Sequence, residues 1–168
     1  MKPKFARAYM DVAHRFSQLS HAQRLQVGAI IVKDDRIISI GYNGMPAGWN
    51  NNCEDKIYID PEAGGWLSPE EIWQEWPFED LDGQRYKLVT KPEVLHAESN
   101  ALAKLARTTE SGENAVLFVT HSPCLNCAKL IFQSGITTVY YDINYRDSSG
   151  IEFLEKSGVI VERVDNNG

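Results

Sequence analysis

The sequence predicts one α/β domain, with a central sheet of about five strands and helices on both faces. Its 168 residues are the usual size of a single domain, and we expect one domain over residues 1–168, with an insertion at about 49–94. Hydrophobic residues make up 43% and charged residues 24%, the mix of a globular protein that buries one core. From residue 96 onward, helical and extended segments alternate, as β-α-β units do.

The first part of the chain predicts one helix and one hairpin. Apolar residues recur at helical spacing over 5–19, which indicates an amphipathic helix. Two runs rich in β-branched residues, 27–32 and 36–41, are separated by the short polar segment 33–35, and this pattern favours a hairpin. Residues 41–48 contain three glycines and a proline, so we expect a loop there.

The insertion at 49–94 is less regular and contains all four tryptophans of the chain. A short helix is predicted from Ser68, because Ser68-Pro69-Glu70-Glu71 combines an N-cap residue, a proline at the first helical position and acids in the first turn. A loop of this length in a compact domain is usually functional or faces a partner. The alternative is an insertion that packs its own tryptophans, and the sequence leaves both interpretations open.

The second half of the chain supplies most of the sheet. We predict helices over 96–107, 124–133 and 149–157, and strands over 115–120, 136–141 and 159–164. Gly135 and Gly158 follow two of the helices directly, the position that C-cap glycines occupy.

Charge and composition exclude several classes of function. The formal net charge is −6 and the pI is near 5.2, the opposite of the balance of a sequence-independent polynucleotide binder. A small anionic substrate would need a local cationic pocket. No apolar run approaches the roughly 18 residues of a membrane span, and the N-terminus lacks a signal peptide. We therefore expect the protein in the cytoplasm, or in the host cytoplasm if a phage encodes it.

Two short motifs carry the chemistry. His96-Ala97-Glu98 and Pro123-Cys124-Leu125-Asn126-Cys127 each open a predicted helix. His96, Cys124 and Cys127 supply three zinc ligands and leave the fourth position for water, which indicates a catalytic metal. Glu98 is placed to move protons as general acid and base. H-x-E combined with P-C-x-x-C is the signature of zinc nucleobase deaminases. A structural histidine or a redox C-x-x-C pair would each explain only one motif.

The rest of the chain resembles the deoxycytidylate (dCMP) deaminases of phage and viral type, within the zinc-dependent cytidine/deoxycytidylate deaminase superfamily. The resemblance covers practically the full length and is carried by residues 24–29, 36–46, 96–101 and 120–131. It implies a three-layer α/β/α cytidine-deaminase-like fold with a mixed five-stranded sheet. It also implies hydrolysis of dCMP to dUMP for thymidylate synthesis, by a homohexamer that dCTP with Mg²⁺ activates and dTTP inhibits.

Several residues are candidates for substrate binding. Asn43 offers both a donor and an acceptor from a glycine-flanked loop, although turn formation would also explain it. Arg24 is a candidate phosphate ligand or a solvated surface residue, and Gln26 lies in the same matched stretch. Tyr145 follows a predicted strand, where α/β sheets meet their ligands, or it packs at the rim. His121 precedes the cysteine loop and is a candidate to support the metal ligands.

The effector residues are inferred from the resemblance. Tyr42, Gly44 and Met45 belong to the loop that would meet the triphosphate and its Mg²⁺. Arg107 lies eleven residues after His96, three helical turns along the same face, and would meet a phosphate or a neighbouring subunit.

The sequence departs from its relatives at one place. Some similar phage enzymes hold a second, structural zinc with extra cysteines, whereas this chain has His21 at the first such position and only Cys53 at the second. We therefore predict one zinc ion per chain. The competing functions are another deaminase of the superfamily, acting on cytidine, cytosine, guanine or tRNA adenosine, and a non-catalytic zinc-stabilised binding module.

Overall fold

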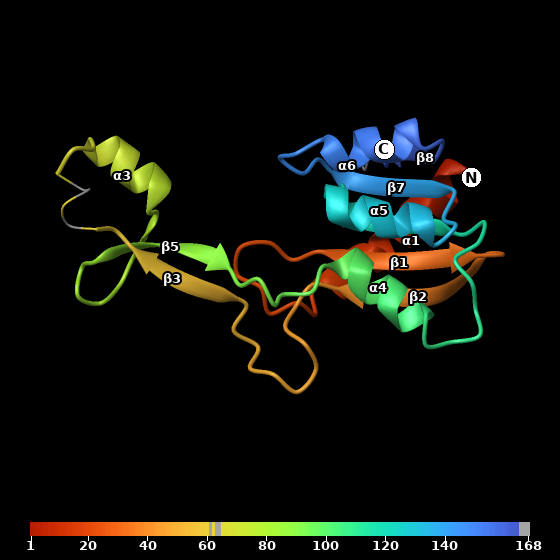
Figure 1. Ribbon diagram of the computed structural model, residues 1–168, viewed down its shortest axis with the longest axis horizontal. Coiled ribbons are helices and arrows are strands. Elements are labelled where there is room, and N and C mark those ends of the chain that lie inside the picture. The colour runs from red at the N-terminus through yellow and green to blue at the C-terminus, as the bar shows by residue number, and fades with distance from the viewer. Residues whose placement is uncertain (61, 63–64, 165–168) are drawn as a thin grey trace.

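The computed structural model, which describes residues 1–60, 62 and 65–164, consists of a main body and a smaller projecting arm (Figure 1). The body contains a five-stranded sheet with the order β2-β1-β6-β7-β8. β1 pairs antiparallel with β2 and β6, whereas β7 pairs parallel with β6 and β8, so the sheet is mixed as expected. The strands are β1 Gly28–Lys33, β2 Arg36–Tyr42, β6 Val116–His121, β7 Thr138–Ile143 and β8 Ile160–Arg163.

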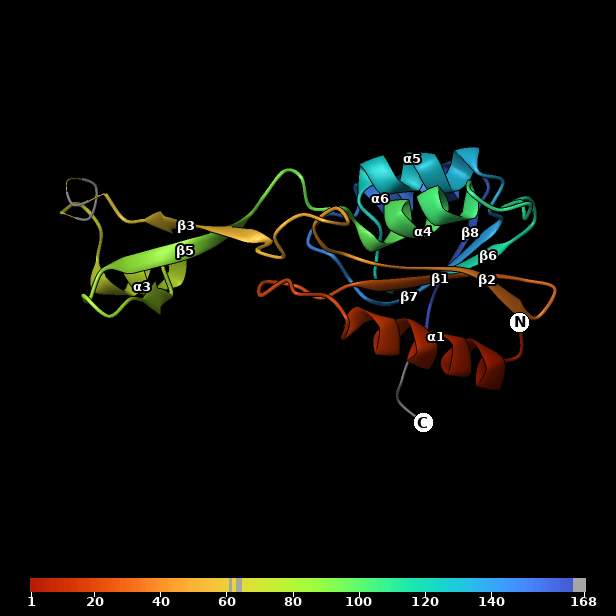
Figure 2. The same ribbon diagram turned by 90° about the horizontal axis from the view of Figure 1, so that it is seen from below.

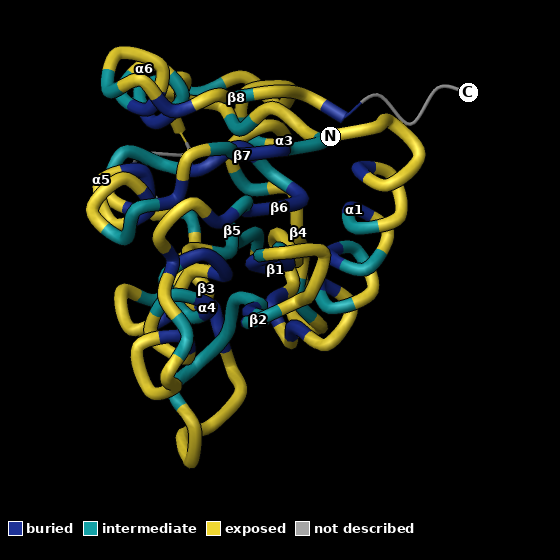
Figure 3. The backbone as a smooth tube through the Cα atoms, turned by 90° about the vertical axis from the view of Figure 1, so that its right-hand side faces the viewer, coloured by how far each residue is buried: buried dark blue, intermediate teal, exposed yellow. Residues whose placement is uncertain are grey.

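Helices cover both faces of this sheet, which confirms the three-layer α/β/α fold. α1 (Pro3–Ser17) lies on one face, and α4 (Ala97–Leu105), α5 (Leu125–Gln133) and α6 (Ser149–Lys156) lie on the other (Figure 2). One apolar cluster joins Met10 and Ala13 of α1 to the sheet, and a larger one joins the other three helices to its opposite face. Figure 3 shows the buried residues gathered along the central strands between these layers.

The predicted turns take the conformations that their residues favour. Asp34 and Asp35 both have positive φ angles, 51° and 59°, which matches the two-residue turns that suit a twisted hairpin. Gly135 and Gly158 have φ angles of 82° and 81° just beyond α5 and α6, so both are C-cap glycines as predicted. Several predicted boundaries are off by about two residues, and one of these affects a candidate site residue: α4 ends at Leu105, so Arg107 lies in the turn beyond the helix and not on its face.

Residues 54–93, which we call the arm, contain a second sheet that the sequence did not predict. β3 (Glu54–Tyr58), β4 (Phe78–Glu79) and β5 (Arg85–Thr90) form an antiparallel sheet in the order β3-β5-β4. The predicted helix is α3 (Pro69–Glu75), and Ser68 forms a capping box with Glu71.

The described residues of the arm beyond Glu54 form no core of their own, because none of them is buried. Trp66 is 90% exposed and Trp73 is 57% exposed, so these tryptophans do not pack together inside an insertion. Within the described part of the chain, no helix has both the length and the apolar character needed to cross a membrane.

Candidate active site

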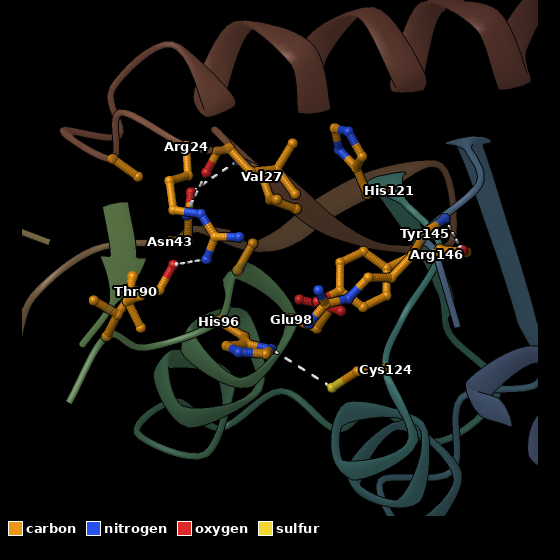
Figure 4. A pocket seen from close by; sticks show the side chains of 16 residues that line it. Arg24, Val27, Asn43, Thr90, His96, Glu98, His121, Cys124, Tyr145 and Arg146 are labelled. Carbon is orange, nitrogen blue, oxygen red and sulfur yellow. Dashed lines mark hydrogen bonds between the residues drawn. The ribbon is translucent and has the colours of Figure 1, made fainter. Parts of the chain in front are cut away.

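The N-termini of α4 and α5 bring the His96-Ala97-Glu98 motif and the Cys124–Cys127 motif together. His96 is the N-cap of α4 and Cys124 is the N-cap of α5, both with extended backbone. An N-cap side chain usually accepts a hydrogen bond from its own helix, but neither of these does. His96 Nδ1 instead lies 3.6 Å from Cys124 Sγ and 3.5 Å from Cys127 Sγ. The three side chains therefore lie close together, and Figure 4 shows His96 facing Cys124.

The spacing of these atoms fits a tetrahedral zinc ion. Bond lengths of about 2.3 Å to sulfur and about 2.0 Å to nitrogen place sulfur and nitrogen about 3.5 Å apart around a tetrahedral centre. Both measured distances agree with this value, and all three ligand atoms lie within 4.8 Å of one another. Among the described residues, no other group of three or more His, Cys, Asp or Glu side chains has such spacing. The donor set thus suits a zinc ion with one position open.

The hydrogen bonds within this group make the two thiols unequal as acids. Hydrogen bonds with Cys127 and His96 lower the pKa of Cys124 to about 3, and the bond to Cys124 together with burial raises the pKa of Cys127. The bond with Cys124 also raises the pKa of His96. A divalent cation at this group would let both sulfurs exist as thiolates, and the N-terminal ends of the helices favour that charge.

Glu98 stands beside the metal ligands, in the first turn of α4. Its side chain is 4% exposed, and this burial raises its pKa to about 7. A carboxyl group in this range can both accept and donate a proton near neutral pH, which is the property of a general acid–base catalyst.

His96, Cys124 and Glu98 line a pocket of about 340 Å³. Arg24, Asn43 and Thr90 line one side, and His121, Tyr145 and Arg146 line the other (Figure 4). The pocket thus combines a metal-binding floor with two arginines, although the chain as a whole is acidic.

Of the predicted substrate residues, Asn43 and Gln26 make contacts within the protein. Asn43 Oδ1 accepts from the Val27 N–H at 2.8 Å, and its Nδ2 donates to the Leu25 carbonyl at 2.8 Å. Gln26 is not among the residues that line the pocket, and its Nε2 donates to the Ser20 carbonyl at 2.8 Å. Both side chains thus bind the backbone of the loop that carries Arg24. A contact of either residue with substrate stays a prediction.

On the opposite side of the pocket lies Arg146, which no motif in the sequence indicates. Its guanidinium lies over the Tyr145 ring, 5.7 Å from the centroid, and the Tyr145 N–H donates to Ser122 Oγ at 2.7 Å. Its position, directly after Tyr145 and beyond the carboxyl end of β7, is the signal that could have identified it.

His121 lines the pocket itself. Burial and the charge of His14 lower its pKa. Its Nδ1 lies 3.2 Å from Thr120 Oγ1, which accepts the Gly28 N–H.

The predicted effector residues lie outside the pocket lining. The Tyr42 ring lies 5.4 Å from Lys104 Nζ, and Met45 packs against a small buried cluster of Ala22, Cys53 and Val94. Gly44 and Leu95 exchange two backbone hydrogen bonds, of 3.1 and 2.9 Å. Arg107 is exposed.

Cys53 is almost fully buried, its pKa is raised by burial, and its thiol donates to the Asn51 carbonyl. His21 is exposed, and the two residues do not belong to a described metal-binding group. The number of zinc ions per chain stays a prediction.

The sequence and the fold of this chain are similar to those of known proteins. The family model for the cytidine and deoxycytidylate deaminase zinc-binding region matches residues 3–143, which include all four of His96, Glu98, Cys124 and Cys127. The deoxycytidylate deaminase of Enterobacteria phage T4 is 38% identical over 177 residues, with 95% of this chain and 89% of that protein covered. ComE operon protein 2 of Bacillus subtilis is 32% identical, with 94% and 69% covered. The solved structure of dCMP deaminase from cyanophage S-TIM5, in complex with dCMP and dUMP, matches with a TM-score of 0.75 and 41% identity, and 97% of this chain and 98% of that chain are covered.

Proposed function

The chain belongs to the cytidine and deoxycytidylate deaminase family of zinc-dependent hydrolases, and from that premise we propose that it converts dCMP and water to dUMP and ammonia. The observation that carries the proposal is the buried Glu98 beside a His/Cys/Cys group of tetrahedral spacing, at the floor of a pocket with two arginines. A structural zinc site would need a fourth ligand and would have no use for this carboxylate.

Glu98 carries the proton transfers in this reaction. A zinc ion bound by His96, Cys124 and Cys127 supplies the Lewis acidity that makes hydroxide available near neutral pH. The Glu98 carboxylate takes the proton of the attacking water and delivers it to ring N3 as oxygen bonds to C4. It then passes the second water proton to the amino group, and the C4–N bond breaks to release ammonia. Because Glu98 is buried, bulk water does not compete for these protons.

Arg24 and Arg146 are suited to the 5′-phosphate. They line opposite sides of the pocket, where two guanidinium groups offer charge-assisted hydrogen bonds to an anion. Tyr145 and Asn43 also line the pocket, and we assign them contacts with the deoxyribose. The three free cysteines fit a reducing cytoplasm.

A homohexamer, the assembly implied by the resemblance, would give the arm a partner surface. Trp73, Tyr58 and Phe78 are each at least 42% exposed, more apolar surface than a small sheet usually leaves uncovered. The arm holds 11 of the chain's 23 acidic residues but four of its 17 lysines and arginines. Two arms would therefore repel each other, whereas the outer face of α1 in a second copy offers opposite charge, with exposed Lys4, Arg7 and Arg15.

We further propose regulation by dCTP with Mg²⁺ as activator and dTTP as inhibitor, through the loop of Tyr42, Gly44 and Met45. The support is the pair of backbone hydrogen bonds between Gly44 and Leu95, because Leu95 directly precedes the metal ligand His96. A nucleotide that shifts this loop would shift the start of α4, and a displacement of about 1 Å can change a rate by about 10²-fold.

Ammonia release from dCMP, deoxycytidine and cytosine tests the proposed function. We expect dCMP to be the preferred substrate, with a sigmoidal rate curve that becomes nearly hyperbolic with dCTP and Mg²⁺. Preference for a base or nucleoside without phosphate would refute the assigned substrate. A hyperbolic rate curve that neither dCTP nor dTTP changes would refute the proposed regulation but not the proposed deaminase activity.

A further inference from the structure

Glu54 is a buried carboxylate at the base of the arm that no step of the proposed reaction uses. It is the first residue of β3 and its side chain is 3% exposed. Its Oε1 accepts the backbone N–H of Gln23 at 3.0 Å and that of Arg24 at 3.2 Å. Its other oxygen, Oε2, is buried without a hydrogen-bond partner among the described residues. A buried carboxylate is costly, so its position at two N–H groups of a pocket loop calls for an explanation.

The loop that Glu54 reaches depends on side chains for its shape. Between α1 and β1, the N–H of Ala22 is bound by Ser20 Oγ at 3.2 Å and the N–H of Val27 by Asn43 Oδ1 at 2.8 Å. Glu54 accepts the N–H groups of Gln23 and Arg24, which lie between Ala22 and Val27 in the sequence. Removal of this acceptor would leave two backbone donors to find new partners, and the loop would have to move to do so.

The arm also holds the Arg24 side chain. Its Nη1 donates to Thr90 Oγ1 at 3.1 Å, and Thr90 is the partner of Glu54 in the β3–β5 ladder. The arm base thus contacts Arg24 at its backbone, through Glu54, and at its guanidinium, through Thr90. Figure 4 shows Arg24 and Thr90 meeting at this side of the pocket.

We propose that Glu54 is a positioning residue for recognition of the substrate's phosphate. Its carboxylate fixes the backbone of Arg24, so that the guanidinium stands at the pocket before substrate arrives. The inference rests on the proposed function, which gives Arg24 the phosphate of dCMP. A group misplaced by about 1 Å can lose up to about 10²-fold in rate, and we expect a loss of about tenfold because Arg146 remains in place.

The test compares substrates with and without phosphate. In Glu54→Ala, kcat/KM for dCMP should fall about tenfold, mainly through KM, whereas kcat/KM for deoxycytidine should change less than about twofold. Calorimetry should show about tenfold weaker binding of dUMP and unchanged binding of deoxyuridine. Glu54→Gln should restore dCMP activity to within about threefold, because its amide oxygen can accept the same two N–H groups.

Two further variants keep the test decisive. Asp55→Ala is the matched control, because this neighbouring carboxylate is exposed and pairs with Lys91, outside the Arg24 loop. It should leave both substrates unchanged. If Glu54→Ala does not fold, Glu54→Asp withdraws the carboxylate by one methylene and should produce a smaller loss with the same selectivity.

An equal loss on dCMP and deoxycytidine would show a merely structural role and overturn the inference, as would unchanged activity on dCMP. A wild-type protein that does not prefer dCMP over deoxycytidine would instead refute the proposed function.

Discussion

Gly150 offers a test of how the fold holds the zinc ligands. It lies in the first turn of α6, buried against the loop that carries Cys124. A Cβ atom at this position would lie 1.9 Å from the Pro123 carbonyl oxygen and 2.9 Å from the Cys124 carbonyl carbon. Ordinary contact begins near 3.4 Å, so Gly150→Ala requires α6 and the Pro123–Cys124 backbone to separate by about 1.5 Å.

Two effects of this substitution oppose each other, and their sizes decide the result. Alanine is favoured over glycine inside a helix by up to about 1 kcal/mol. Overpacking typically costs about 1–3 kcal/mol, and the contact here is with backbone, which cannot rotate away. We therefore expect a net loss of about 1–2 kcal/mol, which lowers the Tm by roughly 2–8 °C in a chain of this size.

The same substitution should also weaken zinc binding, because the displaced backbone belongs to the ligand Cys124. A metal site tolerates deviations of about 0.2 Å in its ligand distances, which is far less than the required movement beside Cys124. A decrease of about 10–100-fold in affinity is expected, as for other lost supports of metal ligands. Competition with a colorimetric zinc chelator measures this directly. Gly44→Ala is the control, because its added methyl group would meet no atom within 4 Å. Unchanged zinc affinity with a raised Tm in Gly150→Ala would refute the packing argument.

Three further outcomes are expected. Glu98→Gln should lower kcat by at least about 10²-fold and keep its zinc, because glutamine has nearly the same shape but cannot transfer protons. Activity and metal content are measured in parallel. Activity above about a tenth of wild type would contradict the role of Glu98. Cys53→Ala should leave zinc at one ion per chain by elemental analysis, since this thiol joins no metal group among the described residues, and a fall from two to one would reveal a second site. Removal of zinc by a chelator should abolish activity but leave the far-UV circular dichroism nearly unchanged, since two apolar clusters hold the body together; unfolding would indicate a structural metal.

The body and the metal group could be predicted because local sequence signals and burial agree there. The strands β1 and β6 carry runs of buried apolar residues, and α5 and α6 are each followed by a glycine with positive φ. The metal group was predictable for a different reason: zinc restricts its ligands to a few residue types at fixed spacing. His96 and Cys124 are also N-cap residues, so the motif and the helix start coincide in the sequence.

The strands of the arm could not be predicted from the spacing of apolar residues, because apolar and polar residues alternate regularly only in strands that bury one face. β3 reads Glu-Asp-Lys-Ile-Tyr, and after Glu54 none of its residues is buried. β5 alternates Tyr86 and Leu88 with Arg85 and Lys87, but all four are only half-buried. Their order depends on ladder hydrogen bonds and on contacts such as those of Tyr86 with Phe78 and Tyr58. By contrast, α3 could be predicted, because its capping box involves only Ser68 and Glu71, three residues apart in the sequence.

The side-chain contacts that shape the pocket belong to a third category, which neither periodicity nor motif can reveal. Glu54 is 30 residues from Arg24, and Asn43 is 16 residues from Val27. Asn43 drew attention as a substrate contact because its amide has both a donor and an acceptor, yet the backbone of the Arg24 loop uses both functions. The residue types suited to bind a nucleotide are the same types suited to bind an irregular backbone, since both present N–H and C=O groups. A polar residue near an active site therefore acquires its role from what its hydrogen bonds reach. In this pocket Glu54 and Asn43 bind the backbone of the loop that carries Arg24, and these hydrogen bonds define what the two side chains do in the fold.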